Sequence, residues 1–148
     1  MTSRSARCWW APTASRSPRT ATGWPAGTAP GTGELALAQW ATAHLSPAER
    51  AGATVYTSGE HCPMCAAAHA WVGLGRIVCA SSSEQLEQRL TELGAPAPPV
   101  RTLPVTAVAP DVAVEGPVPE LADQVRRLHV RLHERGTLAG QHWQAPPP

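Results

Sequence analysis

The sequence predicts an α/β fold, in which helices pack on a central sheet. Between Ala53 and Leu93, short runs of β-branched and apolar residues alternate with longer segments in which Ala and Leu recur every three or four residues. Glycine and serine, which end helices and begin them, separate the two kinds of segment. Strands that alternate with helices in this way are typical of layered α/β domains. A length of 148 residues suits one such domain.

The chain changes in character at Glu34. Residues 1–33 contain no Leu, Ile, Val, Phe, Tyr, Asp, Glu or Lys. A segment of this composition is not expected to supply a strand or an amphipathic helix. We therefore expect a low-complexity segment over residues 1–33, a folded domain over residues 34–135 and a C-terminal tail over residues 136–148.

Three interpretations of residues 1–33 stay open. The composition is typical of a disordered segment. It is also compatible with a transit peptide, although repeated Pro and Gly would interrupt the amphipathic helix of such a peptide. The third interpretation is a shifted coding frame. With G+C-rich codons, the neighbouring frame converts Arg7–Ala14 into Val-Leu-Val-Gly-Ala-Asp-Gly, a strand followed by a turn, and places a His at position 32. The first strands of the domain would then be missing or degraded in this chain.

The elements of the folded domain are expected where the periodicity changes. Helices are expected where Ala or Leu recurs at helical spacing, over residues 34–45, 62–72, 84–93 and 119–135. Strands are expected where β-branched and apolar residues cluster, over residues 53–57, 77–80 and 103–108. A further short helix should begin at Ser46, because Ser46-Pro47-Ala48-Glu49 has the residues of a capping box with Pro at the first helical position.

The last predicted helix is amphipathic. Its apolar residues are expected to face inward, at Leu121, Val125, Leu128 and Leu132. Its arginines are expected on the outer face as solvated charges, at Arg126, Arg127 and Arg131. A contact of these arginines with phosphate or RNA is the less favoured interpretation.

Composition argues against several classes of protein. A net charge of +1 and an isoelectric point near 7.8 give no large basic surface, which argues against a nucleic-acid-binding protein. No apolar stretch reaches the length that spans a bilayer, and Met1 is followed by polar residues rather than an apolar signal core. We therefore expect a cytoplasmic protein with no membrane partner. The four cysteines are unevenly spaced, so reduced thiols or metal binding are expected in place of disulfides.

Cys62 and Cys65 form the one spaced motif among the cysteines. They are separated by Pro63 and Met64, at a predicted junction of strand and helix. Both sulfur atoms can reach one point there, and the positive end of the helix stabilises thiolates. This geometry suits a zinc site and also a thioredoxin-like dithiol.

The cysteine pair lies in a longer pattern that runs from Glu34 to about Ala80. The pattern contains a strand, turn and helix start, Ala53-Thr54-Val55-Tyr56-Thr57-Ser58-Gly59-Glu60-His61-Cys62-Pro63-Met64-Cys65-Ala66, and then a strand, Gly75-Arg76-Ile77-Val78-Cys79-Ala80. It resembles the zinc-dependent cytidine/deoxycytidylate deaminase superfamily. The Pro-Met between the cysteines and the later Val118-Pro119-Glu120-Leu121 are similar to the guanine deaminase, nucleoside deaminase and tRNA-adenosine deaminase branch.

The resemblance has implications for fold and function. It implies a cytidine-deaminase-like, three-layer α/β/α fold with a central mixed sheet. It implies a bound Zn²⁺ and hydrolytic deamination of a nucleobase or nucleoside of the guanine, cytosine or adenosine type. A small-molecule substrate is favoured over tRNA, and a homodimer is expected.

The resemblance also assigns roles to individual residues. Cys62 and Cys65 would be two zinc ligands, and Glu34 would be the catalytic proton shuttle. The third ligand of the family lies two residues before the glutamate, at the position of Thr32. A hydroxyl is a poor zinc ligand, so this chain would hold metal weakly. Two alternatives stay open: a catalytically inactive deaminase-like subunit, and a dithiol redox protein that uses Cys62 and Cys65.

Other side chains near the motif have less specific interpretations. His61 replaces the usual Pro and is expected to point away from Cys62, while His69 is expected to be packed rather than to bind metal. Glu60 is expected to be a surface carboxylate, or to orient the cysteine loop. Cys79 is expected to be a buried, inert thiol. Two tryptophans are expected in the core, at Trp40 and Trp71.

Overall fold

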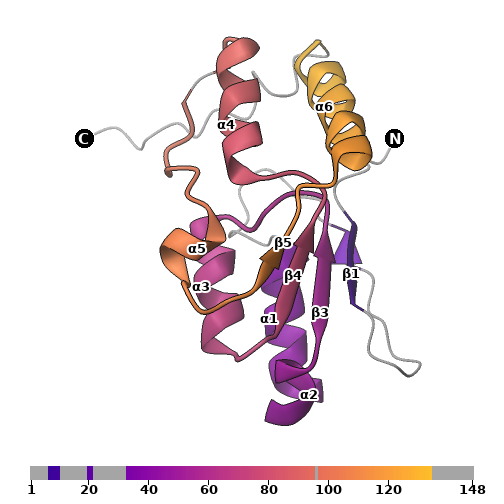
Figure 1. Ribbon diagram of the computed structural model, residues 1–148, viewed down its shortest axis with the longest axis vertical. Helices are drawn as coiled ribbons and strands as arrows, with labels where there is room; N and C mark the ends of the chain where they lie inside the picture. The colour runs from indigo at the N-terminus through magenta and orange to yellow at the C-terminus, as the bar shows by residue number, and fades with distance from the viewer. Residues whose placement is uncertain (1–6, 11–19, 22–32, 96, 135–148) are drawn as a thin grey trace.

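Strands and helices alternate between residues 54 and 92, as the sequence predicts. The computed structural model describes residues 7–10, 20–21, 33–95 and 97–134 (Figure 1). In chain order, the described elements are β1 (Arg7–Trp10), β2 (Thr20–Ala21), α1 (Gly33–His44), α2 (Pro47–Ala51), β3 (Thr54–Thr57), α3 (Pro63–Trp71), β4 (Arg76–Cys79), α4 (Ser83–Glu92), α5 (Val105–Val108), β5 (Val114–Glu115) and α6 (Pro119–Glu134).

The described strands form one mixed sheet in the order β2-β1-β3-β4-β5. β3, β4 and β5 run parallel, whereas β1 runs antiparallel to β2 and β3. Val55 of β3 lies beside Ile77 of β4, and Ile77 lies beside Val114 of β5. Parallel neighbours need a crossover, which α3 provides between β3 and β4, so the carboxyl ends of both strands meet at one edge. The predicted α/β class is thereby confirmed.

One face of this sheet is covered by helices. Val55 and Ile77 are register partners, so their side chains point to the same face, and both are fully buried. Val55 packs in a first apolar cluster with residues of α1, namely Leu37, Ala38 and Ala41. Ile77 packs in a second cluster with residues of α3, α5 and the loop that follows, namely Ala66, Val105 and Ala109. Small alanines let α1 and α3 approach the sheet closely.

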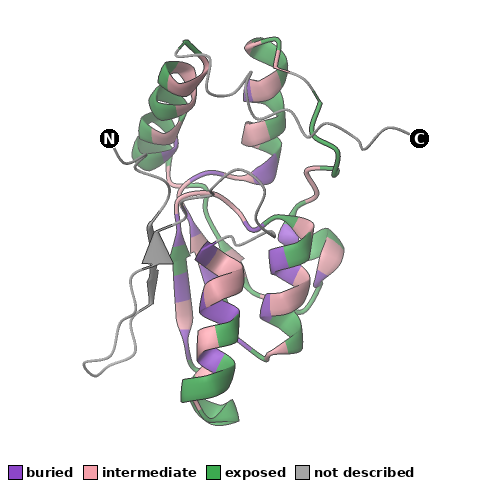
Figure 2. Ribbon diagram, turned by 180° about the vertical axis from the view of Figure 1, so that it is seen from behind, coloured by how far each residue is buried: buried purple, intermediate pink, exposed green. Residues whose placement is uncertain are grey.

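The opposite face of the sheet is more open. Tyr56 of β3 is 41% exposed on this side, and Arg76 of β4 forms an exposed ion pair with Glu115 of β5 at 2.7 Å. α4 and α6 extend beyond the carboxyl ends of the strands (Figure 1), and they are mostly intermediate or exposed (Figure 2). The finer expectation of a three-layer, cytidine-deaminase-like arrangement stays a prediction.

Local sequence signals place the helix boundaries correctly. The predicted capping box at Ser46 is confirmed: the Glu49 backbone N–H donates to Ser46 Oγ at 3.3 Å, and the Ser46 backbone N–H donates to Glu49 Oε2 at 2.8 Å. A second capping box, between Ser82 and Gln85, begins α4. The four longer predicted helices are also confirmed, with boundaries shifted by a residue or two.

The predicted strand over residues 103–108 is wrong. Val105–Val108 forms the short helix α5, with Pro104 at its N-cap. The backbone N–H of Val105 donates to Glu60 Oε1 at 2.8 Å, so a distant carboxylate satisfies the helix start. This tertiary contact overrides the strand preference of the two valines. The last strand is β5 instead.

The expectation that residues 1–33 supply no strand is also wrong. β1 and β2 lie in this segment, and β1 pairs with β3 through the partners Trp9 with Tyr56 and Trp10 with Val55. Strand pairing uses backbone hydrogen bonds, and tryptophan is compatible with strands, so the absence of branched aliphatic residues did not prevent it. The other residues of this segment, and the expected tail over 136–148, lie outside the described residues.

The prediction for α6 is confirmed in part. The three arginines are exposed and Val125 and Leu132 are half-buried, as expected, but Leu121 and Leu128 are 45% and 50% exposed and Ala122 is buried in their place. α6 contacts α4 through polar groups: Arg89 donates to the Ala122 carbonyl oxygen, and Arg126 pairs with Glu92.

Within the described part of the chain, no helix combines the length and apolar character that crossing a bilayer requires.

Gly75 provides a test of the packing between the α2–β3 turn and the start of β4. A Cβ atom at Gly75 would lie 2.5 Å from the carbonyl oxygens of both Ala51 and Ala53. Both oxygens belong to the backbone, so relieving the clash would require a shift of the main chain. We expect Gly75→Ala to lower the free energy of unfolding by about 1–3 kcal/mol or more, measured by chemical denaturation. Gly59→Ala is the matched control, because a Cβ there meets nothing within 4 Å. Equal stability of the two variants would contradict this packing.

Candidate metal centre

The candidate site lies at the carboxyl end of β3, where three segments meet. Thr57 ends β3, Glu34 lies in the first turn of α1, and Cys62 is the N-cap residue of α3. Thr57 Oγ1 lies 3.2 Å from Glu34 Oε1 and 2.8 Å from the carbonyl oxygen of Gly59. A hydroxyl has one proton, so Thr57 donates to one of these acceptors at a time. Thr57 therefore ties the Glu34 carboxylate to the strand that leads into the cysteine loop.

The two cysteines are adjacent at the start of α3. Cys62 is exposed, whereas Cys65 is buried within the first turn. The pKa of the Cys62 thiol is lowered to about 6, chiefly by a hydrogen bond from the Cys65 thiol and also by the backbone N–H groups of Cys65 and Met64. Partial burial and the negative charge of Glu34 act in the opposite direction and raise it. The first turn of α3 thus favours the thiolate form of Cys62, at the positive end of a helix.

The effect of Glu34 on Cys62 shows that these predicted site residues are brought together. They are 28 positions apart in the sequence, yet the charge of one opposes ionisation of the other. Cys62 and Cys65 are free thiols rather than a disulfide. Among the described residues, however, no group of three or more His, Cys, Asp or Glu side chains is arranged to hold a metal ion. Two thiols converge, and Thr32, at the expected third position, lies outside the described residues.

His61 does not complete the ligand set. Its side chain is 2% exposed and packs edge-on against His69, with ring centroids 5.2 Å apart. Burial, with a smaller effect from His69, lowers the pKa of His61 to about 3, so the ring is neutral. This placement agrees with the expectation that His61 points away from the exposed Cys62. His69 Nε2 lies 2.7 Å from the Gly75 carbonyl oxygen and is the donor there, which confirms that His69 is a packed residue.

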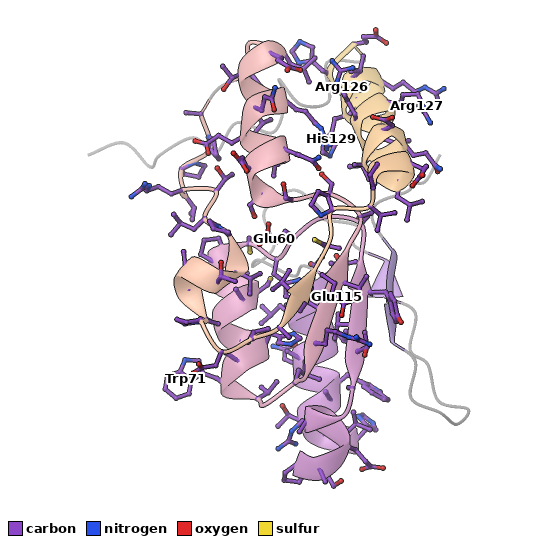
Figure 3. All side chains as sticks on the ribbon, in the orientation of Figure 1. Glu60, Trp71, Glu115, Arg126, Arg127 and His129 are labelled. Carbon is purple, nitrogen blue, oxygen red and sulfur yellow. The ribbon has the colours of Figure 1, made fainter. Side chains whose placement is uncertain are left out.

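Glu60 holds the cysteine loop in place, and the expectation of a surface carboxylate is wrong. Glu60 Oε2 accepts a hydrogen bond from the backbone N–H of Ser83 at 2.7 Å, and Oε1 accepts one from Val105 at 2.8 Å. Its own backbone N–H donates to the carbonyl oxygen of Ser81 at 2.8 Å. Figure 3 shows Glu60 between the N-terminal ends of α4 and α5. One carboxylate therefore satisfies a free N–H group at the start of each helix.

No model of a known protein family matches this chain, and no curated protein sequence matches it.

Three further expectations concern side chains outside the candidate site. Cys79 is buried, and burial raises the pKa of its thiol to about 11, in agreement with an inert thiol. Trp40 packs against the first apolar cluster and stacks on His44, with ring centroids 4.9 Å apart. Trp71 was expected in the core, and this is wrong, because it is 89% exposed at the end of α3 (Figure 3).

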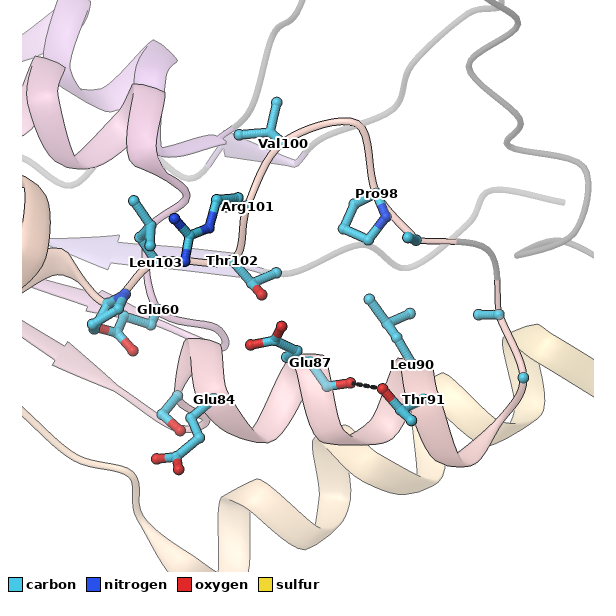
Figure 4. A pocket seen from close by; sticks show the side chains of 15 residues that line it. Glu60, Glu84, Glu87, Leu90, Thr91, Pro98, Val100, Arg101, Thr102 and Leu103 are labelled. Atoms are coloured by element: carbon cyan, nitrogen blue, oxygen red, sulfur yellow. Dashed lines mark hydrogen bonds between the residues drawn. The ribbon is translucent and has the colours of Figure 1, made fainter.

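A cavity of about 790 Å³ lies beside the site rather than in it. Figure 4 shows Glu87 and Leu90 of α4 on one side of this cavity, and Pro98, Val100 and Arg101 on the other. Glu60 also lines the cavity, but Glu34, Cys62 and Cys65 do not. Its volume is that of a small-molecule pocket. The cavity is nevertheless separate from the candidate metal centre.

Sequence reasoning missed Thr57 and the bridging role of Glu60. The partners of Glu60 lie 23 and 45 positions away, at Ser83 and Val105. The serine cap at Ser82 signals a helix start, but no local pattern says which carboxylate reaches it. For Thr57, the one signal is its place at the end of a predicted strand.

Alkylation of Cys62 tests the charge balance at the site. In metal-free protein with a chelator, we expect the rate of iodoacetamide labelling at Cys62, followed by peptide mass spectrometry, to rise with pH around a midpoint near 6. Cys65→Ala should raise this midpoint, because it removes the main hydrogen bond. Glu34→Gln should lower the midpoint, because it removes a nearby negative charge. A midpoint at the ordinary thiol value of about 8.5 in the unmodified chain would contradict the geometry.

Glu60→Gln tests the bridge between the two helices. Glutamine keeps one acceptor oxygen, but its NH₂ group would face the second backbone N–H and leave that donor without a partner. We expect a loss of about 1–3 kcal/mol in the free energy of unfolding, measured by urea denaturation. Glu87→Gln, at an exposed position lining the same cavity, is the control and should change stability little.

Proposed function

We propose that this chain is a zinc-dependent aminohydrolase that deaminates a nucleobase or nucleoside. The observation that supports the proposal is the meeting of Glu34, Cys62 and Cys65 at one end of β3. These residues come from two helices and match the two ligands and the proton shuttle that the sequence resemblance implies. A free base or nucleoside is the proposed substrate, in preference to tRNA.

The donor set fits zinc in part. Cys62 and Cys65 would hold the ion through their sulfur atoms. The lowered pKa of Cys62 favours its thiolate, which is the form that binds metal. Zinc, when bound, supplies a Lewis acid that makes water reactive near neutral pH. Three protein ligands and one open position are typical of such sites. Thr32 at the third position is the reason to expect weak binding in this chain.

Glu34 would carry the protons of the reaction. Its carboxylate accepts a proton from the attacking water as the water oxygen bonds to the ring carbon that bears the amino group. The same proton is delivered to the adjacent ring nitrogen. A second proton passes through Glu34 to the amino group, the carbon–nitrogen bond breaks, and ammonia leaves. The Thr57 hydroxyl, at 3.2 Å from Glu34 Oε1, would orient the carboxylate for both transfers.

A dithiol redox function is the second candidate. The hydrogen bond between Cys65 and Cys62 and the lowered pKa of Cys62 are also features of reactive dithiols. An oxidised form of the pair would be a disulfide and would hold no zinc. A reversible disulfide with a defined reduction potential, together with the absence of zinc from protein purified under reducing conditions, would favour this candidate. A third possibility, an inactive deaminase-like subunit, follows from Thr32 and predicts no turnover even when a His is placed at position 32.

Metal content tests the ligand assignment. We expect Thr32→His to raise zinc affinity by roughly 10- to 100-fold or more. Residues that only hydrogen-bond to a metal ligand already contribute an effect of this size, so a direct ligand should contribute at least as much. The affinity should be measured by competition with a chromogenic chelator. Thr32→Gln is the control, because an amide does not replace the imidazole nitrogen. Cys62→Ala should abolish binding, and zinc binding unaffected by Cys62→Ala would exclude the proposed site.

Ammonia release tests the catalytic role of Glu34. With zinc present, we expect Thr32→His protein to release ammonia from at least one of guanine, cytosine, adenosine or their nucleosides. Adding Glu34→Gln should reduce this rate by about 100-fold or more, since general acid–base groups contribute 10²–10⁴. Zinc content should be unchanged. Turnover that survives Glu34→Gln would overturn the mechanism.

A further inference from the structure

The cavity beside the cysteine loop has charged walls that the proposed deaminase site does not use. It lies between α4 and residues 97–104, which lead into α5 (Figure 4). Its volume of about 790 Å³ is in the range of small-molecule pockets. Because Glu34, Cys62 and Cys65 do not line it, an occupant of this cavity would not take the place of the zinc ion.

Carboxylates outnumber basic groups on the walls of the cavity. Glu84 and Glu87 line it from α4, and Glu60 lines it from the loop that precedes α3. Arg101, on the opposite wall, is the one basic side chain among the lining residues. Three carboxylates and one guanidinium leave an excess of negative charge, which favours a ligand with a net positive charge.

The two walls of the cavity carry opposite charges that do not pair with each other. Within the described part of the chain, the Arg101 guanidinium forms no hydrogen bond or ion pair, and neither do the carboxylates of Glu84 and Glu87. The Glu87 side chain is directed toward the wall that carries Arg101 (Figure 4). A ligand with both ammonium groups and a carboxylate would match both walls, because a guanidinium binds a carboxylate through two parallel hydrogen bonds.

An extended organic ligand matches the walls better than a metal ion does. A metal ion requires several ligand atoms that converge on one point, and no three acidic, His or Cys side chains of the described residues are arranged in this way. The charges are instead distributed over both walls, beside the apolar side chains of Leu90, Pro98 and Val100 (Figure 4). Methylene chains that carry ammonium groups pack well on apolar surface of this kind.

We propose that this cavity binds a small zwitterion with more positive than negative charge, of the class of a basic amino acid or dipeptide. Its ammonium groups contact Glu84 and Glu87, and its carboxylate contacts Arg101. Its methylene chains pack on Leu90 and Val100. The site is separate from the candidate metal centre, so binding requires neither zinc nor deamination.

Calorimetric titration of the metal-free full chain with lysyl-lysine tests the presence of the site. We expect saturable binding that weakens as the salt concentration rises. Norleucyl-norleucine keeps the carboxylate but lacks the side-chain ammonium groups, and it should bind roughly 5-fold or more weakly. Lysyl-lysine binding that does not saturate below about 10 mM would overturn the proposal, and so would equal affinity for the two dipeptides.

Arg101→Gln tests the contact with the ligand carboxylate. This variant should weaken lysyl-lysine binding by roughly 2- to 5-fold, the effect of one exposed ion pair, and should not weaken binding of the C-terminal amide of lysyl-lysine. A general charge effect would act the other way, because removing a positive group from the wall would strengthen binding of both cations. Equal weakening of the acid and the amide, or no weakening of the acid, would contradict the assigned contact.

Glu87→Gln tests the contact with the ammonium groups. It should weaken the acid and the amide by a similar factor of roughly 2- to 5-fold, because both carry these groups. Glu120→Gln and Arg127→Gln are the matched controls, at exposed positions of α6 that do not line the cavity, and should leave both affinities unchanged. If Glu120→Gln weakened binding as much as Glu87→Gln, the attraction would be non-specific and the site would be excluded.

Discussion

The carboxylate of Glu60 determines the path of the loop that carries the candidate site. It accepts one backbone N–H from the start of α4 and one from the start of α5, while the backbone of Glu60 bonds to Ser81. Loop segments have little apolar surface with which to anchor themselves, so polar bonds of this kind set their position. Cys62 follows Glu60 by two residues. The placement of the Cys62 and Cys65 sulfur atoms therefore depends on contacts with helices that come later in the chain.

The charges at the end of β3 bear on the proposed metal site. The N-terminus of α3 and the Cys65 thiol stabilise a thiolate at Cys62, whereas the nearby Glu34 carboxylate opposes it. Two negative groups held close together repel each other, and a cation between them would remove the repulsion. A proton shuttle also has to lie near the ion. The same arrangement of charges therefore supports both metal binding and the catalytic role proposed for Glu34.

The contact between α4 and α6 depends on a buried arginine. α4 and α6 contact each other through Arg89, an arginine that is 6% exposed and donates to a hydroxyl and a carbonyl oxygen. A buried guanidinium is costly unless its donors are satisfied, so this contact has a defined geometry. Leu121 and Leu128 of α6 are exposed on another face.

The sequence by itself determined the local elements and the chemistry of the motif. Capping at Ser46, the Ala-rich start of α3 and the strand that ends at Thr57 each follow from neighbouring residues, so short-range patterns were sufficient. Only the tertiary structure decided that residues 105–108 form a helix, that part of residues 1–33 pairs with β3, and that Leu121 and Leu128 of α6 are exposed. Each of these depends on a partner far away in the chain, such as the carboxylate of Glu60 or the guanidinium of Arg89. Local periodicity records which face of an element is apolar, but it carries no information about which distant group satisfies the backbone or covers that face.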